Sequence, residues 1–318
     1  MTRLKIGTRG SALALWQART VAGLLEAGGT HVELVIIKTD GDRLQERPLT
    51  ETGTKRLFVK EIEDALLRGD VDLAVHSAKD MPAELTADLD VAAVLPREDP
   101  RDALVLPGSI EHPDMATALT HLDETPVIGT SSVRRIAQLA GAIPQASFAA
   151  IRGNVDTRLR KLDSGEFNAL VLAAAGMRRL GFGPRISAAI PIDVCIPAPG
   201  QGVVAIEIRA DDRATRAILE AINDRPASLS LEAERAVVVA LGGGCQLPLG
   251  AIALHHNGSI RLQAIVASPD GRDVIKREAS GPASAPAELG RRVAEALAQA
   301  GAGRILDDCR AQTAEPGQ

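Results

Sequence analysis

The chain has 318 residues, with 36 Lys and Arg against 41 Asp and Glu, which gives a formal net charge of −5. This length predicts two or three domains, each large enough to bury a core. The acidic balance excludes a global positive field that would attract nucleic acid, and aromatic residues, at 2 %, offer little for base stacking. No apolar run approaches the ~18 residues of a membrane span and no signal region precedes the first strand-like pattern, so we expect a cytoplasmic protein without membrane partners.

The first part of the chain alternates short apolar runs with amphipathic segments. We expect strands near residues 4–7, 32–38, 71–75 and 91–95, and helices over 13–24 and 58–68. Ser11 is a good N-cap for the first helix, whose free backbone N–H groups would face an anion beside Arg9. The alternation predicts a parallel, doubly wound sheet, and the long polar connection at 39–56 is predicted to be mobile or functional.

The stretch 71–82 is the most informative single segment. An apolar strand through Val75 ends abruptly in polar side chains, namely His76, Ser77, Lys79 and Asp80. Ligands of open α/β sheets gather at the carboxyl ends of strands, so this pattern favours a binding site. The alternative is a solvated loop with a local Lys79–Asp80 pair, and the segment by itself leaves both interpretations open.

Two crossings rich in proline, glycine or charge, at 96–102 and 196–202, divide the chain. Between them the layout of the first part recurs, because residues 128–132 repeat the strand and hydroxyl turn of residues 6–11. The strand at 203–208 is predicted to return the chain to the first domain. Two lobes joined by two crossings describe a clamshell with its ligand in the cleft between them.

Cations recur where a strand gives way to a helix. Arg134 and Arg135 lie in the first turn of a helix, where positive charge opposes the helix dipole, so a bound anion is expected there. Of Arg178 and Arg179, one should face inward, and the sequence leaves open which. The full set is Arg9, Lys79, Arg134, Arg135, Arg152, Arg158 and Arg179. Any single one is explained as a solvated surface residue, but together they predict a multiply anionic ligand, and without a Walker loop a nucleotide is not expected.

A third unit begins at Ser228. We expect a helix to Leu241, then a glycine run ending in Cys245, and then β-like runs at 249–255, 259–267 and 273–279 covered by a helix at 286–300, with a frayed end from about 310. A cysteine after three glycines lies on a loop whose backbone can approach another group closely, so its thiol is expected to be accessible. The alternative is a cysteine that serves only as inert packing.

The cysteines and histidines give no metal signature. Cys195, Cys245 and Cys309 are odd in number and widely separated, so we expect reduced thiols, with neither a disulfide framework nor a zinc site. Cys195 is interpreted as packing in an apolar run and Cys309 as lying near a loose tail. His76 has no companion at metal spacing and is interpreted as a hydrogen-bonded structural histidine.

Five motifs, in order along nearly the whole chain, resemble the porphobilinogen deaminase family. They are Ile6-Gly7-Thr8-Arg9-Gly10-Ser11-Ala12-Leu13-Ala14, His76-Ser77-Ala78-Lys79-Asp80, Gly129-Thr130-Ser131-Ser132-Val133-Arg134-Arg135, Arg152-Gly153-Asn154-Val155 and Gly243-Gly244-Cys245-Gln246. The resemblance implies an α/β protein with two periplasmic-binding-protein-like (type II) lobes and a small α+β domain with a three-stranded antiparallel sheet. The corresponding domains are 1–97 with 200–220, 98–199, and 221–318.

The family reaction implied is the deamination and head-to-tail condensation of four porphobilinogen molecules onto a covalent dipyrromethane, giving a linear tetrapyrrole. By resemblance, Cys245 carries the dipyrromethane through a thioether and the catalytic Asp80 stabilises the positive charge left when ammonia departs. Each pyrrole carries an acetate and a propionate, which explains the need for many cations. The resemblance also implies a monomer whose partner is the small-molecule substrate.

The remaining site residues are carried over by the same resemblance. Those matching cofactor-binding positions are Ser11, Lys79, Asp80, Thr130, Ser132, Arg134, Arg135 and Arg158. Those matching substrate-binding positions are Arg9, Ser77, Arg152, Arg158, Arg179, Lys55 and Phe58. Phe58 either stacks on a pyrrole or belongs to the core, and Arg56 departs from the glycine that the family often has.

The competing interpretation is a noncatalytic small-anion binding module, since clamshell lobes also serve solute capture and sensing. The absence of a signal segment and of a helix-turn-helix candidate counts against it. The loop with Cys245 would have no role in such a module.

Overall fold

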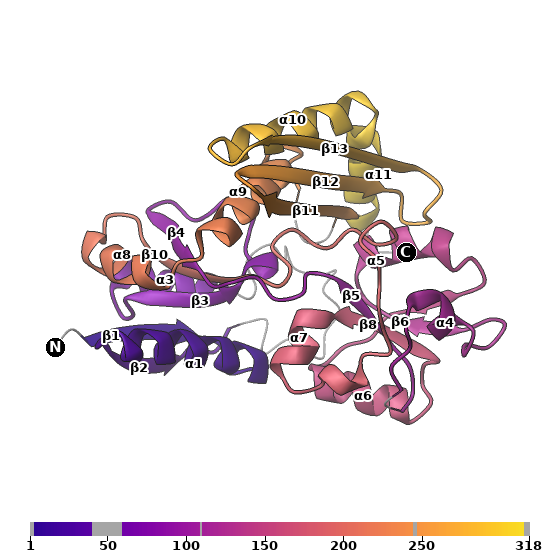
Figure 1. Cartoon of the computed structure of the whole chain (residues 1–318), viewed down its shortest axis with the longest axis horizontal. Coiled ribbons are helices and arrows are strands. Elements are labelled where there is room, and N and C mark those ends of the chain that lie inside the picture. The colour runs from indigo at the N-terminus through magenta and orange to yellow at the C-terminus, as the bar shows by residue number, and fades with distance from the viewer. Residues whose placement is uncertain (1–2, 40–58, 109, 244–246, 315–318) are drawn as a thin grey trace.

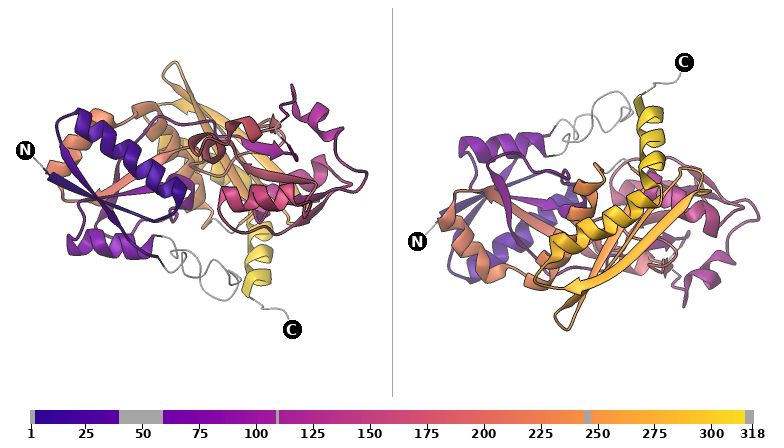
Figure 2. Two further views of the ribbon diagram at one scale, coloured as in Figure 1. Left: turned by 90° about the horizontal axis from the view of Figure 1, so that it is seen from below. Right: turned by 90° about the horizontal axis from the view of Figure 1, so that it is seen from above.

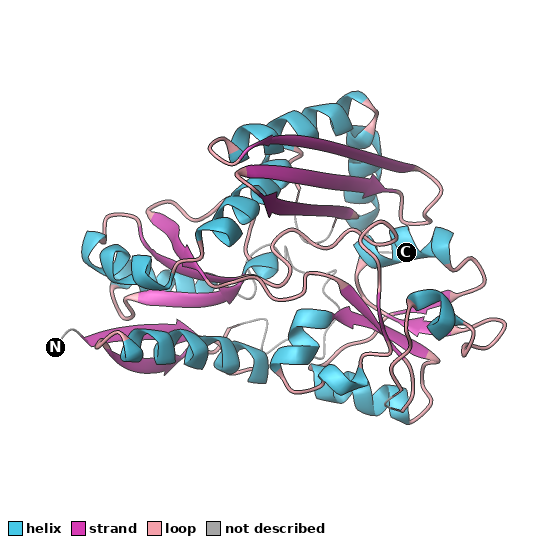
Figure 3. Ribbon diagram, viewed as in Figure 1, coloured by secondary structure: helices cyan, strands magenta, loops and turns pink. Residues whose placement is uncertain are grey.

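The computed structural model describes residues 3–39, 59–108, 110–243 and 247–314, with side chains described to residue 311. Its ribbon forms two lobes, each built on a five-stranded sheet, and a third body built on a three-stranded sheet (Figure 1, Figure 3). The predictions made for Lys55, Arg56, Phe58 and Cys245, and for most of the polar connection at 39–56, lie outside the described residues.

The first lobe is a mixed sheet with the strand order β2-β1-β3-β10-β4. Its strands are β1 Arg3–Thr8, β2 His31–Ile36, β3 Leu73–Ser77, β4 Leu89–Val94 and β10 Val204–Arg209. The prediction that the strand after the second crossing rejoins this domain is confirmed. The prediction of a parallel sheet is wrong for that strand, because β10 runs antiparallel to both β3 and β4.

Helices cover both faces of the first sheet because its central strand is buried on both sides. Leu73 and Val75 of β3 pack in the core that α1 (Ala12–Ala27) covers, whereas Ala74 packs in the core that α3 (Lys60–Arg68) covers. A run of apolar residues without alternation is what such a doubly covered strand requires.

The second lobe repeats this plan with the order β7-β6-β8-β5-β9. Its elements are β5 Asp102–Val105, α4 Met115–Leu119, β6 Val127–Gly129, α5 Val133–Ala142, β7 Ser147–Ala149, α6 Val155–Asp163, β8 Ala169–Ala173, α7 Ala174–Arg179, η3 Gly183–Arg185 and β9 Ala188–Ala189. Here β5 is the antiparallel member, at the position that β10 takes in the first lobe. The predicted repeat of two lobes is confirmed.

The third body carries the antiparallel sheet β11-β12-β13. After α8 Arg213–Leu219 and η4 Glu220–Ile222 come α9 Arg225–Ala240, β11 Leu249–His256, β12 Ser259–Ala267, β13 Val274–Pro282, α10 Pro286–Gln299 and α11 Ala302–Ala314. Figure 2 shows α10 laid across this sheet.

The end of the chain differs from the sequence expectation. In place of a frayed segment from residue 310, α11 continues to Ala314, and Cys309 packs in the core of the third body with Ile305 and Leu306. No helix within the described ranges is long and apolar enough to cross a membrane. The sheet memberships support domains at 1–97 with 200–220, 98–199 and 221–318, and we propose these limits.

A fully buried carboxylate joins the third body to the crossings. Glu234 of α9 accepts hydrogen bonds from the guanidinium of Arg97 at 2.5 Å, from Gly200 N at 2.6 Å and from Ala253 N at 2.7 Å. Arg97 lies in the first crossing, Gly200 in the second and Ala253 in β11. One side chain therefore fixes both crossings to the third body.

The crossings also touch each other at Gly202. Glu98 N donates to Gly202 O at 3.0 Å, the φ of Gly202 is 85°, and a Cβ at this position would overlap the carbonyl oxygen of Glu98. Only glycine fits this combination of left-handed backbone and close approach.

Gly202→Ala should therefore destabilise the fold by roughly 2–4 kcal/mol, measured by thermal unfolding. Gly165→Ala is the matched control, because Gly165 also has a positive φ, of 81°, but has open space around its Cβ position. The control should lose only the ~1–2 kcal/mol of backbone strain. Equal losses for the two variants would show that the contact with Glu98 is not tight.

Candidate functional site

The turn after β3 brings Lys79 and Asp80 to the junction of the two lobes. The strand ends at Ser77, and a single 3₁₀ turn, η2 (Ala78–Asp80), follows it. Ala78 is buried and its N–H donates to Val203 O at 3.0 Å, so the turn is fixed to β10. This anchoring leaves Asp80 exposed at the end of the turn.

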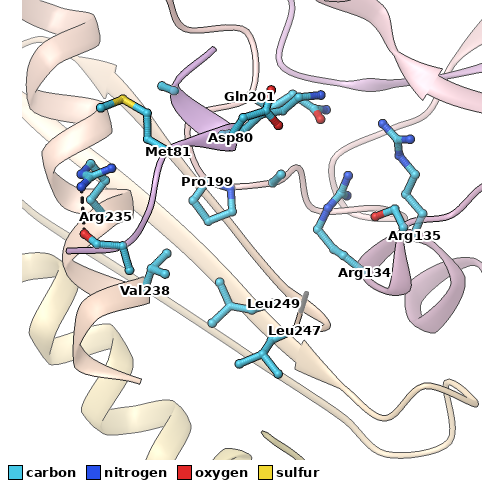
Figure 4. Close-up of a pocket in the computed structure, with 15 residues that line it drawn as sticks. Asp80, Met81, Arg134, Arg135, Pro199, Gln201, Arg235, Val238, Leu247 and Leu249 are labelled. Carbon is cyan, nitrogen blue, oxygen red and sulfur yellow. Dashed lines mark hydrogen bonds between the residues drawn. The ribbon is translucent and has the colours of Figure 1, made fainter. Parts of the chain in front are cut away.

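A cavity of ≈190 Å³ lies beside this turn (Figure 4). Lys79, Asp80, Ser132, Arg134 and Arg135 give it a polar side drawn from both lobes, and the second crossing contributes Pro199 and Gln201. The other side is mostly apolar, with Met81, Val238, Leu247 and Leu249, and also carries Arg235. The cavity therefore suits a ligand that has anionic groups at one end and apolar groups at the other.

A smaller cavity of ≈60 Å³ lies on the other side of Asp80, within the first lobe. Arg9, Ser11, Gln17 and Ser77 line it together with Asp80. Ser11 caps α1 as predicted, accepting from Ala14 N at 3.3 Å, and Ser77 Oγ accepts from Gln17 Nε2 at 2.8 Å. Asp80 is the one carboxylate among the described residues that line these two cavities.

The anion expected at the start of α5 is a residue of the chain itself. Asp102 is fully buried, and its carboxylate accepts from Arg134 Nη1 at 2.8 Å and from Arg135 Nε and Nη2 at 3.0 and 2.8 Å. Gln201 Nε2 adds a further bond at 2.9 Å. Asp102 is therefore an internal anion that offsets the conflict with the helix dipole, and the binding of a ligand anion by these two arginines stays a prediction.

These contacts control the ionisation of the cluster. Burial alone would raise the pKa of Asp102, but the charges and hydrogen bonds of Arg134 and Arg135 outweigh it and hold that pKa well below its usual range. The neighbouring Cys195 is buried, which raises its pKa to about 12 and keeps it a thiol. The interpretation of Cys195 as unreactive packing agrees with this environment.

Other cations of the predicted set are poorly hydrated. Burial lowers the pKa of Lys79, and the adjacent charge of Asp80 offsets this only in part. Burial also lowers the pKa of Arg158 to about 10, with the charge of Arg135 acting in the same direction. A bound anion would relieve the cost of holding these cations together, so the electrostatics favour an anionic ligand.

Arg179 is the inward-facing member of its pair. It is largely buried, its Nη2 donates to Gly202 O at 2.8 Å, and its guanidinium lies 5.4 Å from the ring centroid of Trp16 in α1. Arg178 is more exposed and pairs with Asp99 at 3.1 Å. Arg179 therefore spans from the second lobe to the first lobe and the crossing.

Not every predicted residue lines a cavity. Thr130 is buried, with its Oγ1 accepting from Ser132 N at 3.3 Å, and Arg158 donates to Gly153 O at 2.8 Å. Among the predicted residues that the structure describes, those that line neither cavity are Thr130, Arg152, Arg158 and Arg179. His76 is the structural histidine that the sequence predicts, because its buried ring lies 3.1 Å from Glu207 Oε2.

Sequence reasoning missed Asp102, Gln201 and Arg235, all of which line the large cavity or bond to its lining. Asp102 stands directly before the apolar run of β5, and Arg235 interrupts the apolar stripe of α9. A charged residue within a buried element is the signal that could have identified both. Within the described residues, no group of three or more His, Cys, Asp or Glu is arranged to hold a metal ion.

Two family models match the chain. Residues 4–217 match the porphobilinogen deaminase, dipyromethane cofactor binding domain, and residues 228–299 match the porphobilinogen deaminase, C-terminal domain. Porphobilinogen deaminase of Moorella thermoacetica is 45 % identical over 315 residues, covering 98 % of each chain. Porphobilinogen deaminase of Chromobacterium violaceum is 45 % identical over 311 residues, covering 96 % of this chain and 97 % of its own.

The solved structures that resemble this fold share much less sequence identity with the chain. Substrate binding domain 2 of Lactococcus lactis GlnP, in an open conformation, has a TM-score of 0.40 and 13 % identity over 76 % of this chain and 91 % of its own. The periplasmic VFT2 domain of Bordetella pertussis BvgS has a TM-score of 0.38 and 18 % identity over 70 % of this chain and 86 % of its own.

Asp102→Asn should destabilise the protein by about 3–5 kcal/mol at neutral pH, because it leaves two buried arginines without their counter-charge. The pKa of Asp102 is lowered by folding, so its contribution is fully present above the unfolded pKa of about 4 and declines as the pH falls from there toward the much lower folded pKa. The difference in unfolding free energy between wild type and variant should therefore be constant from about pH 8 to pH 5 and shrink by about 1.4 kcal/mol per pH unit below about pH 4. A difference that is the same at pH 3 as at pH 7 would contradict the role of the charge.

Proposed function

The chain belongs to the porphobilinogen deaminase family, and on that premise we propose which of its residues carry out the reaction. As a member of this family it is a transferase of porphyrin biosynthesis with a dipyrromethane cofactor. It deaminates four porphobilinogen molecules and condenses them head to tail into hydroxymethylbilane. The assignment of individual residues below is our proposal.

The described residues fit a dipyrromethane. This group has two pyrrole rings bearing acetate and propionate chains, so it needs several cationic donors and an apolar surface. The ≈190 Å³ cavity provides both, with Lys79, Arg134 and Arg135 facing its apolar side. Leu247, on that side, stands two positions after Cys245 in the sequence. When bound, the dipyrromethane supplies the primer end to which the first substrate unit is joined.

We assign the residues that hold it accordingly. Cys245 forms the thioether, and the carboxylate chains bind to Lys79, Ser132, Arg134 and Arg135. Ser11, Thr130 and Arg158 complete the set proposed from the family resemblance. Because Asp102 fixes Arg134 and Arg135 before any ligand arrives, these two arginines lose little side-chain freedom on binding.

The observation that carries the catalytic proposal is the position of Asp80. It is exposed, it lines both cavities, and no described side chain donates a hydrogen bond to its carboxylate. Its oxygens are thus available to accept pyrrole N–H groups and to stabilise the positive charge that develops on the substrate as ammonia leaves. A fixed carboxylate in a partly enclosed site is worth far more than the same charge in water.

Substrate carboxylates are assigned to the cations and hydroxyls around Asp80. The proposed set is Arg9, Ser77, Arg152, Arg158 and Arg179, together with Lys55 and Phe58, which lie outside the described residues. Arg9 and Ser77 line the small cavity with Asp80, which supports a substrate position on the first-lobe side.

We also propose that the enzyme acts as a cytoplasmic monomer. Both lobes, a crossing and the third body of one chain line the large cavity, so no second copy is needed to complete it. Sedimentation of the purified protein tests the oligomeric state.

The covalent attachment is tested by the intact mass of the denatured protein. Freshly prepared wild type should be heavier than its sequence by one dipyrromethane, whereas Cys245→Ala should have the mass of the unmodified chain and no turnover. Cys195→Ala is the matched control and should keep the added mass, because Cys195 lies buried beside Asp102. A wild type without added mass would favour the anion-binding module instead.

Asp80→Asn keeps the shape of the side chain but removes its charge, so the holoenzyme should retain its dipyrromethane and lose at least about 100-fold in turnover. Formation of linear tetrapyrrole from porphobilinogen measures this loss. Asp70→Asn, a change at an exposed carboxylate that pairs with Arg68, is the control and should leave turnover unchanged. Turnover of Asp80→Asn within a few-fold of wild type would refute the electrostatic role.

A further inference from the structure

Arg235 lines the ≈190 Å³ cavity, and neither the sequence motifs nor the proposed mechanism uses it. It lies on α9, next to Glu234, and Figure 4 shows it across the cavity from Arg134 and Arg135. Its Nη2 donates to the carbonyl oxygens of Pro82 and Ala83 at 3.0 and 2.8 Å. These two carbonyls follow Asp80 and Met81 directly in the chain.

The segment held by Arg235 has few other supports. After η2 ends at Asp80, no helix or strand forms until β4 begins at Leu89. Pro82 has no N–H with which to bond its surroundings. Met81 and Ala83 line the ≈190 Å³ cavity, while Leu85 lines a second hollow of ≈480 Å³ beside β4. Met81 and Leu85 pack in an apolar cluster, but a segment that borders two cavities is packed less completely than a core element and depends in part on its polar anchors.

The anchor itself is well placed to be rigid. Arg235 stands in the middle of a 16-residue helix, one position after the fully buried Glu234. Burial lowers the pKa of Arg235, and the charge of Glu207 offsets this in part, so the half-buried guanidinium is partly shielded from water. Carbonyl oxygens that accept from such a shielded cation form stronger hydrogen bonds than neutral pairs do.

Helix α9 has two connections relevant to the reaction. At its C-terminal end, after Ala240, it leads into the segment that contains Cys245, and near its middle Arg235 holds the segment that follows Asp80. We propose that Arg235 is a positioning residue, which fixes the Asp80 turn to the helix that precedes the attachment cysteine. This inference rests on the roles proposed above for Asp80 and Cys245.

The consequence is a fixed relation between the catalytic carboxylate and the attachment helix. Without Arg235 the segment 81–85 is held by its ends and by the packing of Met81 and Leu85 in the apolar cluster that also contains Leu231. A displacement of about 1 Å at a catalytic group costs up to about 100-fold in rate, while the cations that bind substrate keep their own supports. The expected signature is a loss in kcat with little change in KM.

The test compares three holoenzymes with wild type. Arg235→Met removes the charge and both hydrogen bonds, and Arg235→Lys keeps the charge with fewer donors. Arg209→Met is the matched control, since Arg209 Nη1 also donates to two backbone carbonyls, of Leu66 and Val71, away from both cavities. For each we would measure kcat and KM with porphobilinogen, the intact mass, and hydrogen exchange of the peptide spanning 78–86.

Arg235→Met should retain the dipyrromethane mass, keep KM within about twofold, and lose about 10- to 100-fold in kcat, with faster exchange confined to residues 78–86. Arg235→Lys should fall between it and wild type. Arg209→Met should be less stable to heat, with unchanged kcat and unchanged exchange at 78–86.

Three results would overturn the proposal. A kcat within twofold of wild type would show that the turn needs no such anchor, and a raised KM with normal kcat would make Arg235 a direct ligand of substrate carboxylates. Faster exchange throughout the chain, with activity proportional to the folded fraction, would show that Arg235 stabilises the whole fold and has no specific role at the Asp80 turn. If Arg235→Met does not fold, the same criteria apply to Arg235→Lys. Failure of the proposed function would be seen in a different measurement, because wild type would then lack the added dipyrromethane mass. The hydrogen-exchange result at 78–86 does not depend on that function.

Discussion

The buried ion cluster around Asp102 is the constraint on which the site depends. One carboxylate faces two arginines, so the cluster keeps an excess of positive charge after its internal pairing. Burying any one of these charges without a partner would cost several kcal/mol. The hydrogen bonds that both arginines and Gln201 donate to Asp102 offset that cost. The result is a pair of cations held at fixed positions on the edge of a cavity, at a helix start where positive charge is otherwise unfavourable.

Two buried carboxylates each connect different parts of the chain. Asp102 connects the second lobe to the second crossing through Gln201, and Glu234 connects both crossings to the third body. Each has its oxygens occupied by donors from separate parts of the chain, as a buried charge requires. Because Gly200 and Gln201 are neighbours in sequence, the two clusters meet at the same crossing. The geometry of the cavity is therefore set at this crossing, where the three bodies join.

The sequence predicted the elements well where a local pattern decides them. Apolar runs and helical periodicity located β1, β2, β3, β4, β10, α1 and α3 of the first lobe to within a few residues, and the N-cap at Ser11 was correct. It failed where the answer depends on distant parts of the chain. The antiparallel direction of β10 follows from the path of the crossings, which no window of β10 contains. The partner of Arg134 lies 32 positions away, and the continuation of α11 past residue 310 was missed because these residues were interpreted as a frayed end.

The choice between Arg178 and Arg179 illustrates the same limit. Both stand in the last turn of α7, and helical periodicity alone gives no preference until the position of α1 is known. Trp16 of α1 and Gly202 O of the crossing together define an inward side, and Arg179 occupies it. Residues carried over by family resemblance were thus specified more sharply than residues derived from periodicity, because the resemblance contains three-dimensional information that a local pattern lacks.

The contrast among the carboxylates explains why Asp80 suits catalysis. Asp102 and Glu234 are fully buried and their lone pairs are taken up by internal donors, so neither can respond to a ligand. Asp80 has the opposite environment: it is exposed, it lines two cavities, and its charge acts on the adjacent Lys79. A carboxylate that must stabilise a transient positive charge has to keep its oxygens available until that charge forms. The fold provides this by using other acids to hold the arginines and by anchoring the Asp80 turn through backbone hydrogen bonds that leave its carboxylate free, at Ala78 N on one side and at the carbonyls of Pro82 and Ala83 on the other.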